Sequence, residues 1–400
     1  MHRRPATPGP ETPFLQENCG TRREWLLATG ALAAGCAALP VLPRATTASE
    51  PARNPLPRWR GFNLLNYFQA LGGGDVSDMA IPEDDFRWIR DWGFDFARIP
   101  MDYWLWIDSD CRQSRKMDIA DVTKINESVL ENIDRTVDMG QKYQVHVSLN
   151  FHRAPGYCIN DPEREPFVLW SDARAEDAFV HHWEVFARRY QQISPQQLSF
   201  NLVNEAPTPR EGYMTRGDYA RVMTRAINAI RAISPDRWII VDGLNVGNVA
   251  VDELIPLAPQ RVAQSVHAYS PAGISHYRAN WVDRNNSFVT PTWPLKDKSG
   301  RITWDRKRLE DHYRPWGALV AQGVGVHCGE GGSFNRTPYD VFHAWMSDVL
   351  DILKGHGIGW ALWNFRGSFG VVDSGRKDVN YEDFHGHQLD RRLLTLLQQS

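Results

Sequence analysis

The chain has 400 residues, of which 42% are hydrophobic, and its 45 basic and 48 acidic side chains give a formal net charge of -3. This content supplies ample apolar surface for one large core, and the even spread of both charges argues against a nucleic-acid-binding surface. The 16 tryptophans fit a core rich in large side chains or aromatic faces that stack on sugars.

Residues 1–50 are predicted to be an export signal or tail rather than part of the fold. Arg22 and Arg23 precede a run rich in alanine and leucine, an order that resembles a bacterial twin-arginine export signal. A disordered tail is the alternative. The segment LAAGC, residues 32–36, resembles a lipoprotein box, which would place a lipid on Cys36. The mature protein is then expected in the periplasm or outside the cell, without a membrane span, since no later segment is long and apolar enough.

From about Arg58 onward, apolar and β-branched runs alternate with amphipathic stretches of helical period. The eight candidate strands in chain order are RWRGFNLLN, FDFARIP, VHVSLNFH, LSFNLVNE, RWIIVDGL, AQSVHAY, VGVHCGE and GIGWALWNF. The helical patterns between them cover residues 82–93, 123–140, 172–190, 218–233, a short piece near 252, 306–322, 338–354 and a closing run from 389.

A strand followed by a helix, eight times over, predicts a parallel sheet of the α/β class that closes into a (β/α)8 TIM barrel. The sequence contains no linker that would separate a second domain, so residues 51–400 are expected to form one catalytic domain. An open doubly wound sheet is the alternative, although no glycine-rich phosphate loop follows the first strand.

Polar and aromatic side chains end most of the predicted strands. Because active sites in this fold gather at the C-terminal ends of the strands, we expect these side chains to converge. They are Asn63, Arg98, His152, Asn204, Glu205, His267, Tyr269, Glu330 and Trp363.

Two carboxylates stand out, Glu205 after the fourth strand and Glu330 after the seventh. For either residue alone, a salt bridge or a helix N-cap contact is the more ordinary role. They come from opposite parts of the barrel wall, however, and can face each other across its mouth. Carboxyl groups about 5 to 5.5 Å apart serve retaining glycoside hydrolysis, one as nucleophile and the other as acid and then base. The pair therefore predicts a retaining glycosidase.

The order of short motifs on successive strands resembles family 5 of the glycoside hydrolases, a cellulase-like family of retaining barrel enzymes. These motifs are RGFNL, ARIP, NE, HAY, GEGG and WALWNF, with a histidine ending the third strand. The resemblance covers about residues 58–365, and it implies that Glu205 is the acid/base and Glu330 the nucleophile. Ala206 stands where the family usually has proline, and Gly331 where an aromatic residue is common; both departures concern subfamily and substrate rather than reaction type.

Side-chain chemistry agrees with that division of roles. Glu330 must be ionised to attack, and Arg98 with the Tyr269 hydroxyl is suited to hold it as a charged acceptor. The remaining expected substrate contacts are Asn204 for the sugar 2-hydroxyl, His152 and His267 for other hydroxyls or for Glu205, and Trp363 as the stacking floor.

Further aromatic side chains lie in the predicted loops; which of them face substrate stays open, and the long connection 270–303 is the candidate for one wall of a cleft. Trp281 and Trp293 belong to the long connection 270–303, and loops of that length inside a compact domain are usually functional. The others are Tyr103, Trp104, Trp106, Tyr157 and Trp170.

The cysteines give no sign of a metal site. Cys111, Cys158 and Cys328 form no CxxC pair and no zinc-like spacing with histidine, so neither a metal nor another cofactor is predicted. A bridge between Cys111 and Cys158 stays open, but the odd count and folding before export favour free thiols.

By analogy with the family, the expected reaction is endo-cleavage of a β-1,4 or mixed-linkage glucan, ahead of β-mannan and of exo-cleavage of β-1,3-glucan. Transfer to a sugar instead of water stays open. The alternative of another class is a non-catalytic carbohydrate-binding protein, whose usual sign, a missing carboxylate, is not found here. A serine hydrolase is disfavoured because the chain has no GxSxG motif. We expect a monomer whose partner is a polysaccharide or oligosaccharide.

Overall fold

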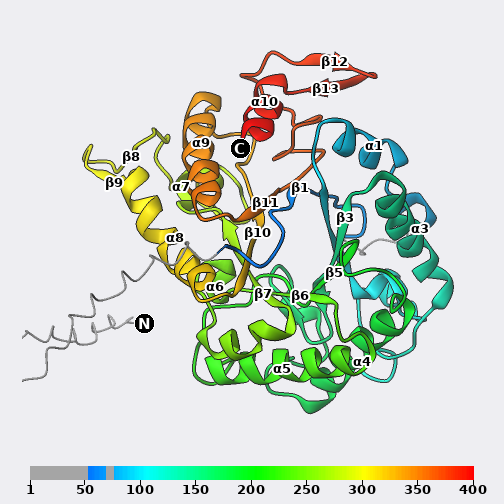
Figure 1. Cartoon of the computed structure of the whole chain (residues 1–400). Coiled ribbons are helices and arrows are strands. Elements are labelled where there is room, and N and C mark those ends of the chain that lie inside the picture. The colour runs from blue at the N-terminus through cyan, green and yellow to red at the C-terminus, as the bar shows by residue number, and fades with distance from the viewer. Residues whose placement is uncertain (1–52, 69–75) are drawn as a thin grey trace, which may run out of the picture. The chain divides into compact units, whose positions relative to one another are not determined.

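The computed structural model describes residues 53–68 and 76–400, which belong to one compact unit, Ser49–Ser400. The predicted export signal, with Arg22, Arg23 and Cys36, lies outside the described residues. The ribbon in Figure 1 shows a central ring of strands with helices around it.

Eight parallel strands close into a barrel, as predicted. Neighbouring strands follow the order β2-β1-β11-β10-β7-β6-β5-β3, and pairing of β2 with β3 closes the ring. Closure excludes the open doubly wound sheet. The strands are β1 (Arg60–Asn63), β2 (Phe96–Asp102), β3 (His146–Ala154), β5 (Leu198–Asn201), β6 (Trp238–Asp242), β7 (Val262–Ala268), β10 (Gly325–Gly331) and β11 (Gly359–Leu362).

The strands are buried on both faces because helices cover the outside of the barrel and side chains, many of them polar, fill its interior. Every residue of β2, β3, β7 and β10 is buried. The register then brings strand ends together: Asn63 of β1 pairs with Arg98 of β2, and Glu330 of β10 pairs with His267 of β7.

Seven α-helices and one 3₁₀-helix follow the eight strands in turn. The helix expected near residue 252 is the 3₁₀-helix η4 (Asp252–Gln260), because Pro256 and Pro259 remove backbone donors that an α-helix needs. The α-helices are α1 (Glu83–Asp91), α3 (Glu127–Tyr143), α4 (Ala173–Arg189), α5 (Arg216–Ile233), α8 (Arg306–Ala321), α9 (Tyr339–Gly355) and α10 (Arg391–Gln399).

Caps explain where several helices begin. Helix α5 starts two residues before the predicted Asp218, because Thr215 and Asp218 form a capping box around its first turn. Helix α3 starts later than predicted, since the Asn126 side chain accepts the Ser128 N–H and caps it there.

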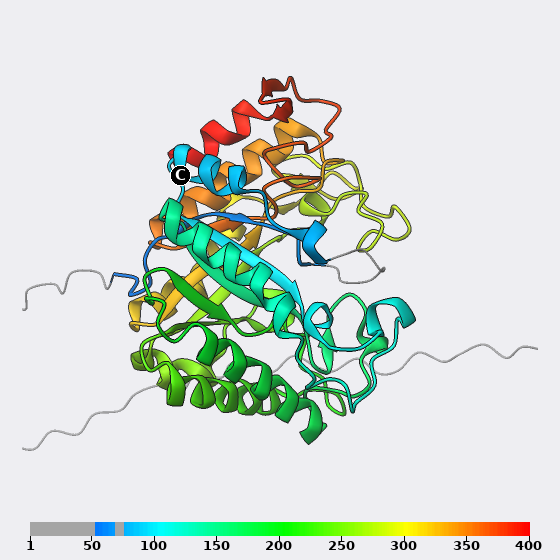
Figure 2. The ribbon, with the colours of Figure 1, turned by 90° about the vertical axis from the view of Figure 1, so that its right-hand side faces the viewer.

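Small elements in the connections were not predicted. Strand β4 (Tyr157–Cys158) pairs with β3, and the hairpins are β8 (Leu295–Lys296) with β9 (Ile302–Trp304) and β12 (Glu382–Phe384) with β13 (His387–Leu389). Figure 2 shows the long connection after β7 at the same end of the barrel as the chain that leaves β1. The short helices are η1 (Val76–Met79), η2 (Tyr103–Trp106), α2 (Cys111–Ser114), η3 (Pro162–Arg164), α6 (Leu244–Gly247) and α7 (Ala272–Ser275).

The aromatic side chains that follow β2 and β3 are buried. Trp106 is fully buried and donates its indole N–H to His182 at 3.0 Å, and the Arg153 guanidinium covers the Trp104 ring at 4.8 Å. Helix η2 turns these side chains inward against the outer helices. The full set is Tyr103, Trp104, Trp106, Tyr157 and Trp170.

The three cysteines of the folded unit are buried and free. Cys111 and Cys158 are therefore not bridged, as the odd count favoured. Within residues 53–68 and 76–400, no helix has the length and apolarity needed to cross a membrane.

Candidate active site

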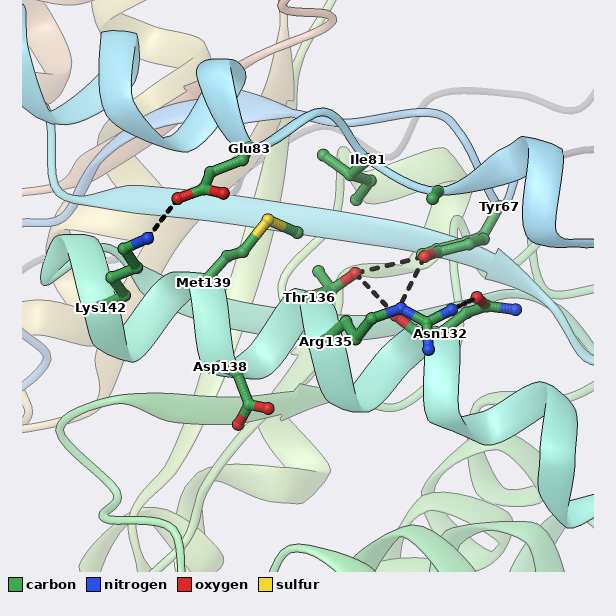
Figure 3. A pocket seen from close by; sticks show the side chains of 10 residues that line it. Tyr67, Ile81, Glu83, Asn132, Arg135, Thr136, Asp138, Met139 and Lys142 are labelled. Carbon is green, nitrogen blue, oxygen red and sulfur yellow. Dashed lines mark hydrogen bonds and ion pairs between the residues drawn. The ribbon is translucent and has the colours of Figure 1, made fainter.

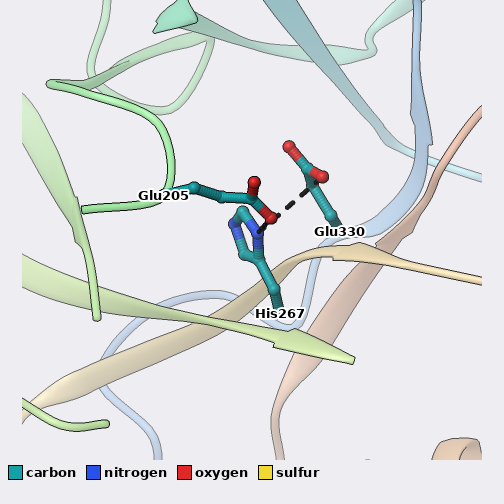
Figure 4. Close-up of side chains that lie close together, drawn as sticks. All are labelled: Glu205, His267 and Glu330. Atoms are coloured by element: carbon teal, nitrogen blue, oxygen red, sulfur yellow. Dashed lines mark hydrogen bonds and ion pairs between the residues drawn. The ribbon is translucent and has the colours of Figure 1, made fainter. Parts of the chain in front are cut away.

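Glu205 and Glu330 meet at the C-terminal end of the barrel. Glu330 lies near the end of β10 with 3% of its side chain exposed, and Glu205 follows β5 with 14% exposed. One carboxylate oxygen of each lies, with a nitrogen of His267, in a group whose members are all within 4.8 Å of one another. Figure 4 shows this arrangement, with dashed lines from His267 to both carboxylates. Such a short separation suits a retaining pair, since an inverting pair leaves room for a water between about 6.5 and 9.5 Å.

The segment that carries Glu205 is held at several points. Strand β5 ends at Asn201, earlier than predicted, and Glu205 has a φ of 49°, a left-handed conformation that is uncommon outside glycine. Its backbone N–H donates to Asp242 Oδ2 at 3.0 Å, and its carbonyl accepts from the Tyr157 hydroxyl at 2.6 Å. Bonds on both sides of the residue fix the direction of its side chain.

Arg98 connects the two halves of the site. Its Nη1 donates to Glu330 Oε1 at 2.6 Å and to Asn63 Oδ1 at 3.0 Å. Its Nη2 and Nε donate to Asn204 Oδ1 and Asn201 Oδ1, each at 2.8 Å. A buried guanidinium with four hydrogen bonds has little freedom to move, so it fixes the position of the Glu330 carboxylate.

Glu330 has a second donor in Tyr269, whose hydroxyl lies 2.9 Å from Oε2. Burial raises the pKa of Glu330, and the positive charges of His267 and Arg98 act against that rise. Burial and the Glu330 charge raise the pKa of Tyr269 well above its ordinary value. Tyr269 therefore keeps its proton and remains a donor to the carboxylate.

His267 is surrounded by carboxylates. Its Nδ1 lies 3.0 Å from Glu205 Oε1 and 3.7 Å from Glu330 Oε2, and its Nε2 lies 3.1 Å from Asp242 Oδ2. Burial alone would lower its pKa, but Glu330 and Asp242 outweigh burial and raise the pKa to about 10. His267 is therefore an imidazolium at neutral pH.

His152 and Trp363 form an aromatic pair in the site. Their rings stack at 5.4 Å with 24° between planes, and Phe68 packs edge-on against both. Burial and the Arg98 charge lower the pKa of His152 well below its usual value, so the ring is neutral. Its Nε2 lies 3.2 Å from Asn204 Nδ2 and accepts from that amide, which places His152 beside Asn204 rather than Glu205.

The eight residues that were given catalytic or substrate-binding roles from the sequence thus lie in one cluster together with Asn63, but some of their partners were not predicted. Asp242 ends β6 and contacts both His267 and the Glu205 backbone. Asn201 accepts a hydrogen bond from Arg98, and the Phe68 ring packs against Trp363. The signal for Asp242 was present, because RWIIVD places a carboxylate at the end of an apolar strand, just as NLVNE does.

Comparison with known families places this site in context. The family model of the cellulases, glycosyl hydrolase family 5, matches residues 53–368. The chain belongs to glycosyl hydrolase family 5. It is therefore an O-glycosyl hydrolase, a retaining enzyme that acts on β-linked polysaccharide, and the non-catalytic alternative is set aside.

Individual relatives support this family 5 assignment. The chain is 27% identical to Endoglucanase C of Acetivibrio thermocellus over 331 residues. This alignment covers 76% of this chain and 90% of the relative. It is 24% identical over 304 residues to Cellodextrinase A of Ruminococcus flavefaciens, covering 75% and 83%. A crystal structure described as a glycoside hydrolase is 38% identical, with a TM-score of 0.78 over 86% of this chain and 99% of that one.

The two tryptophans of the long connection after β7 have different surroundings in this family 5 enzyme. Trp293 donates its indole N–H to Asp348 of the outer helix α9 at 2.8 Å, so it does not line the mouth. Trp281 is 48% exposed, and its ring lies 6.4 Å from the ring of Phe369, which in turn lies 6.3 Å from that of Tyr269. The Phe369 ring thus lies between Trp281 and Tyr269, which donates to Glu330.

The group Glu205, His267 and Glu330 is also a set of potential metal ligands within the described part of the chain. Here the Arg98 guanidinium, 2.6 Å from Glu330 Oε1, already pairs with one of the carboxylates that a metal would need.

A pocket of about 360 Å³ lies on the outside of the barrel, where the segment before α1 faces α3 (Figure 3). The Tyr67 hydroxyl at its floor bonds to the Asn132 carbonyl and the Thr136 hydroxyl, and Lys142 pairs with Glu83 at its rim. These groups are satisfied within the protein, and none of the eight predicted site residues lines the pocket.

Proposed function

We propose that this family 5 enzyme cleaves internal bonds of a β-1,4-linked or mixed-linkage glucan, with Glu330 as nucleophile and Glu205 as acid and then base. The observation that carries this proposal is the pair of carboxylates with oxygens within 4.8 Å, of which only Glu330 is held by the Arg98 guanidinium and the Tyr269 hydroxyl. That asymmetry separates the two roles, because the nucleophile must be a fixed anion before the bond breaks.

In the first step, a Glu330 oxygen attacks the anomeric carbon and forms an ester bond while the glycosidic carbon–oxygen bond breaks. Glu205 gives its proton to the departing oxygen. In the second step, a water oxygen attacks the same carbon, the ester bond breaks, and the water proton passes to Glu205. Two inversions give net retention. Arg98 and Tyr269 receive Glu330 again as an anion.

Sugar contacts come from the groups around the pair. Trp363 is half-buried with its ring stacked on His152, so it offers a firm apolar face to the sugar at the cleavage point. The Asn204 amide oxygen accepts from Arg98, and one of its N–H groups is engaged by His152. The second N–H of Asn204 is free to bind the 2-hydroxyl, a contact that strengthens in the transition state.

The substrate follows from analogy, supported by the names of the relatives above, an endoglucanase and a cellodextrinase. The test is reducing-sugar release from cellulose, mixed-linkage glucan, mannan, xylan and β-1,3-glucan, with Glu330→Ala as the control. We expect the fastest release from a β-1,4-containing glucan, with a rapid fall in polymer length and no release by the variant. Preference for mannan, or products shortened only from one end, would contradict the proposed substrate or mode of action.

Trp281 is expected to bind a sugar unit beyond the cleavage point. Trp281→Ala should lower kcat/KM on long glucan about fivefold, since loss of one stacked aromatic face costs on the order of 1 kcal/mol. Activity on a short aryl β-cellobioside should stay within about twofold. Trp293→Ala is the matched control, because its ring contacts α9 instead. Equal losses on both substrates would show that Trp281 acts through the fold and not through a sugar contact.

We also propose that the chain is exported by the twin-arginine route and acts as a monomer, with Cys36 as a lipid attachment point. This proposal rests on the residues Arg22 and Arg23 and on the LAAGC segment. Replacing both arginines by lysine should hold the protein in the cytoplasm in cell fractionation, and an unchanged location would contradict it. Cys36→Ala should release it from the membrane fraction, and the molar mass in solution tests the monomer.

A further inference from the structure

Asp242 is a buried carboxylate to which the mechanism above gives no role. It is the last residue of β6, and its side chain is fully inaccessible to solvent. Oδ1 accepts from the Asn201 amide at 2.8 Å, and Oδ2 accepts the Glu205 backbone N–H at 3.0 Å. The same Oδ2 lies 3.1 Å from His267 Nε2 and 3.7 Å from Arg98 Nη2. A buried carboxyl group that accepts this many hydrogen bonds is ionised. The positive charges of His267 and Arg98 hold the pKa of Asp242 well below its usual range despite burial.

His267 lies between Asp242 on one side and the catalytic pair on the other. Its Nε2 faces Asp242, and its Nδ1 faces Glu205 at 3.0 Å and Glu330 at 3.7 Å. A neutral imidazole can donate from only one nitrogen, so one carboxylate would then meet a lone pair. Whenever Glu205 is ionised, as it is after the first step, carboxylates lie on both sides of the ring and the ring must be doubly protonated. While Glu205 holds its proton, the ionised Glu330, 3.7 Å from Nδ1, favours the same state. The other titratable or charged groups around this cluster are Arg98 from β2, His152 from β3, Tyr157 from β4, Tyr219 from α5, Tyr269 after β7, and His327 and Cys328 from β10.

A count of formal charges shows what Asp242 contributes. Before reaction, Arg98 and His267 carry two positive charges, and Asp242 and ionised Glu330 carry two negative charges, while Glu205 is protonated. After the first step Glu330 is a neutral ester and Glu205 is the anion. The cluster is neutral in both states only if the Asp242 charge is included. Without the Asp242 charge, this buried cluster would carry one excess positive charge. Such a charge is costly to bury, and loss of a proton from His267 would remove it.

We propose that Asp242 is a positioning residue for both steps of the reaction: it fixes the Glu205 backbone and supplies the constant negative charge that keeps His267 an imidazolium. The imidazolium then remains in place while the negative charge of the pair passes from Glu330 to Glu205, since Nδ1 is within reach of both. The second half of this inference rests on the roles proposed for Glu205 and Glu330. The first half, the charge state of His267, does not.

A purely structural role is the alternative. Asp242 would then only satisfy the Asn201 amide and the Glu205 backbone. Asp242→Asn separates the two readings, because asparagine keeps the shape and an acceptor oxygen but removes the charge. The structural role predicts a change in melting temperature alone. The proposed role predicts in addition that His267 loses a proton at lower pH.

The direct test is NMR of protein labelled with ¹⁵N-histidine, without substrate, with the His267 signals assigned by their absence in His267→Gln. In the wild type both ring nitrogens should stay protonated through pH 8. In Asp242→Asn one proton should be lost at a pH at least about one unit lower, because an adjacent opposite charge shifts a pKa by about 1 to 3 units. A neutral ring in the wild type at pH 8, or an unchanged titration in the variant, would overturn the proposal. The wild-type measurement decides even if the variant does not fold.

Kinetics test the consequence for turnover. In Asp242→Asn, kcat on an aryl β-cellobioside should fall by on the order of 10²-fold, with KM changed less than about threefold. The alkaline limb of the kcat profile should move to lower pH, since the imidazolium now loses its proton earlier. Glu165→Gln is the matched control: its buried carboxylate pairs with Arg153 at 2.8 Å and Tyr103 at 2.7 Å, and it is bonded to neither Glu205, Glu330 nor His267 among the described contacts. An unshifted limb in Asp242→Asn, or an equal shift in the control, would contradict the proposed role.

Discussion

Replacing Glu330 by alanine is expected to lower kcat by on the order of 10⁴-fold or more on every substrate, because the ester intermediate can no longer form. Loss of the first step affects good and poor leaving groups alike. The measurement is steady-state hydrolysis of both mixed-linkage glucan and an aryl β-cellobioside, with melting temperature recorded in parallel.

Two further variants separate chemistry from folding in that experiment. Glu330→Gln keeps a partner for the Arg98 guanidinium and the Tyr269 hydroxyl, so it should stay folded and yet be inactive. Glu382→Ala removes an exposed carboxylate that pairs with Arg391, and it should leave kcat unchanged. Substantial activity in a folded Glu330 variant would rule out Glu330 as the nucleophile.

Glu205→Ala is expected to produce a different defect, because Glu205 acts in both steps. Hydrolysis of glucan, whose leaving group needs a proton, should fall by about 10²- to 10⁴-fold. An aryl glycoside with a good leaving group should still form the glycosyl-enzyme and then stall. Stopped-flow absorbance should therefore show a rapid burst of one phenolate per enzyme, followed by slow turnover with a lowered KM. Equal losses on both substrates without a burst would contradict the acid/base role of Glu205.

The barrel and the identity of its active end could be predicted because they depend on features that repeat along the chain. Eight apolar runs, each followed by a helical pattern, admit few arrangements, and parallel strands place all their C-terminal ends on one side. Glu205 and Glu330 could then be paired across the mouth without knowledge of any side-chain contact. The strand register was not predicted; the structure shows that it places Glu330 beside His267.

Other features depend on contacts that no local pattern encodes. Trp104 and Trp106 follow a strand end, where sequence places cleft residues, but η2 turns them into the core against Arg153 and His182. Trp293 lies in a long loop, yet its indole is bonded to an outer helix. Asp242 was missed because its importance lies in distances to groups from three other strands. In a barrel of this kind, every polar residue at the C-terminal end of a strand is therefore a candidate for the active site.

The most direct test of the central claim is the stereochemistry of products formed with azide and a 2,4-dinitrophenyl β-cellobioside. In Glu330→Ala, azide should attack the anomeric carbon from the face that Glu330 has vacated and give the α-glycosyl azide. In Glu205→Ala, azide should intercept the glycosyl-enzyme from the opposite face and give the β-glycosyl azide. NMR of the anomeric proton distinguishes the two. A β product from Glu330→Ala together with an α product from Glu205→Ala would reverse the assignment, and the same anomer from both would contradict the two-step mechanism.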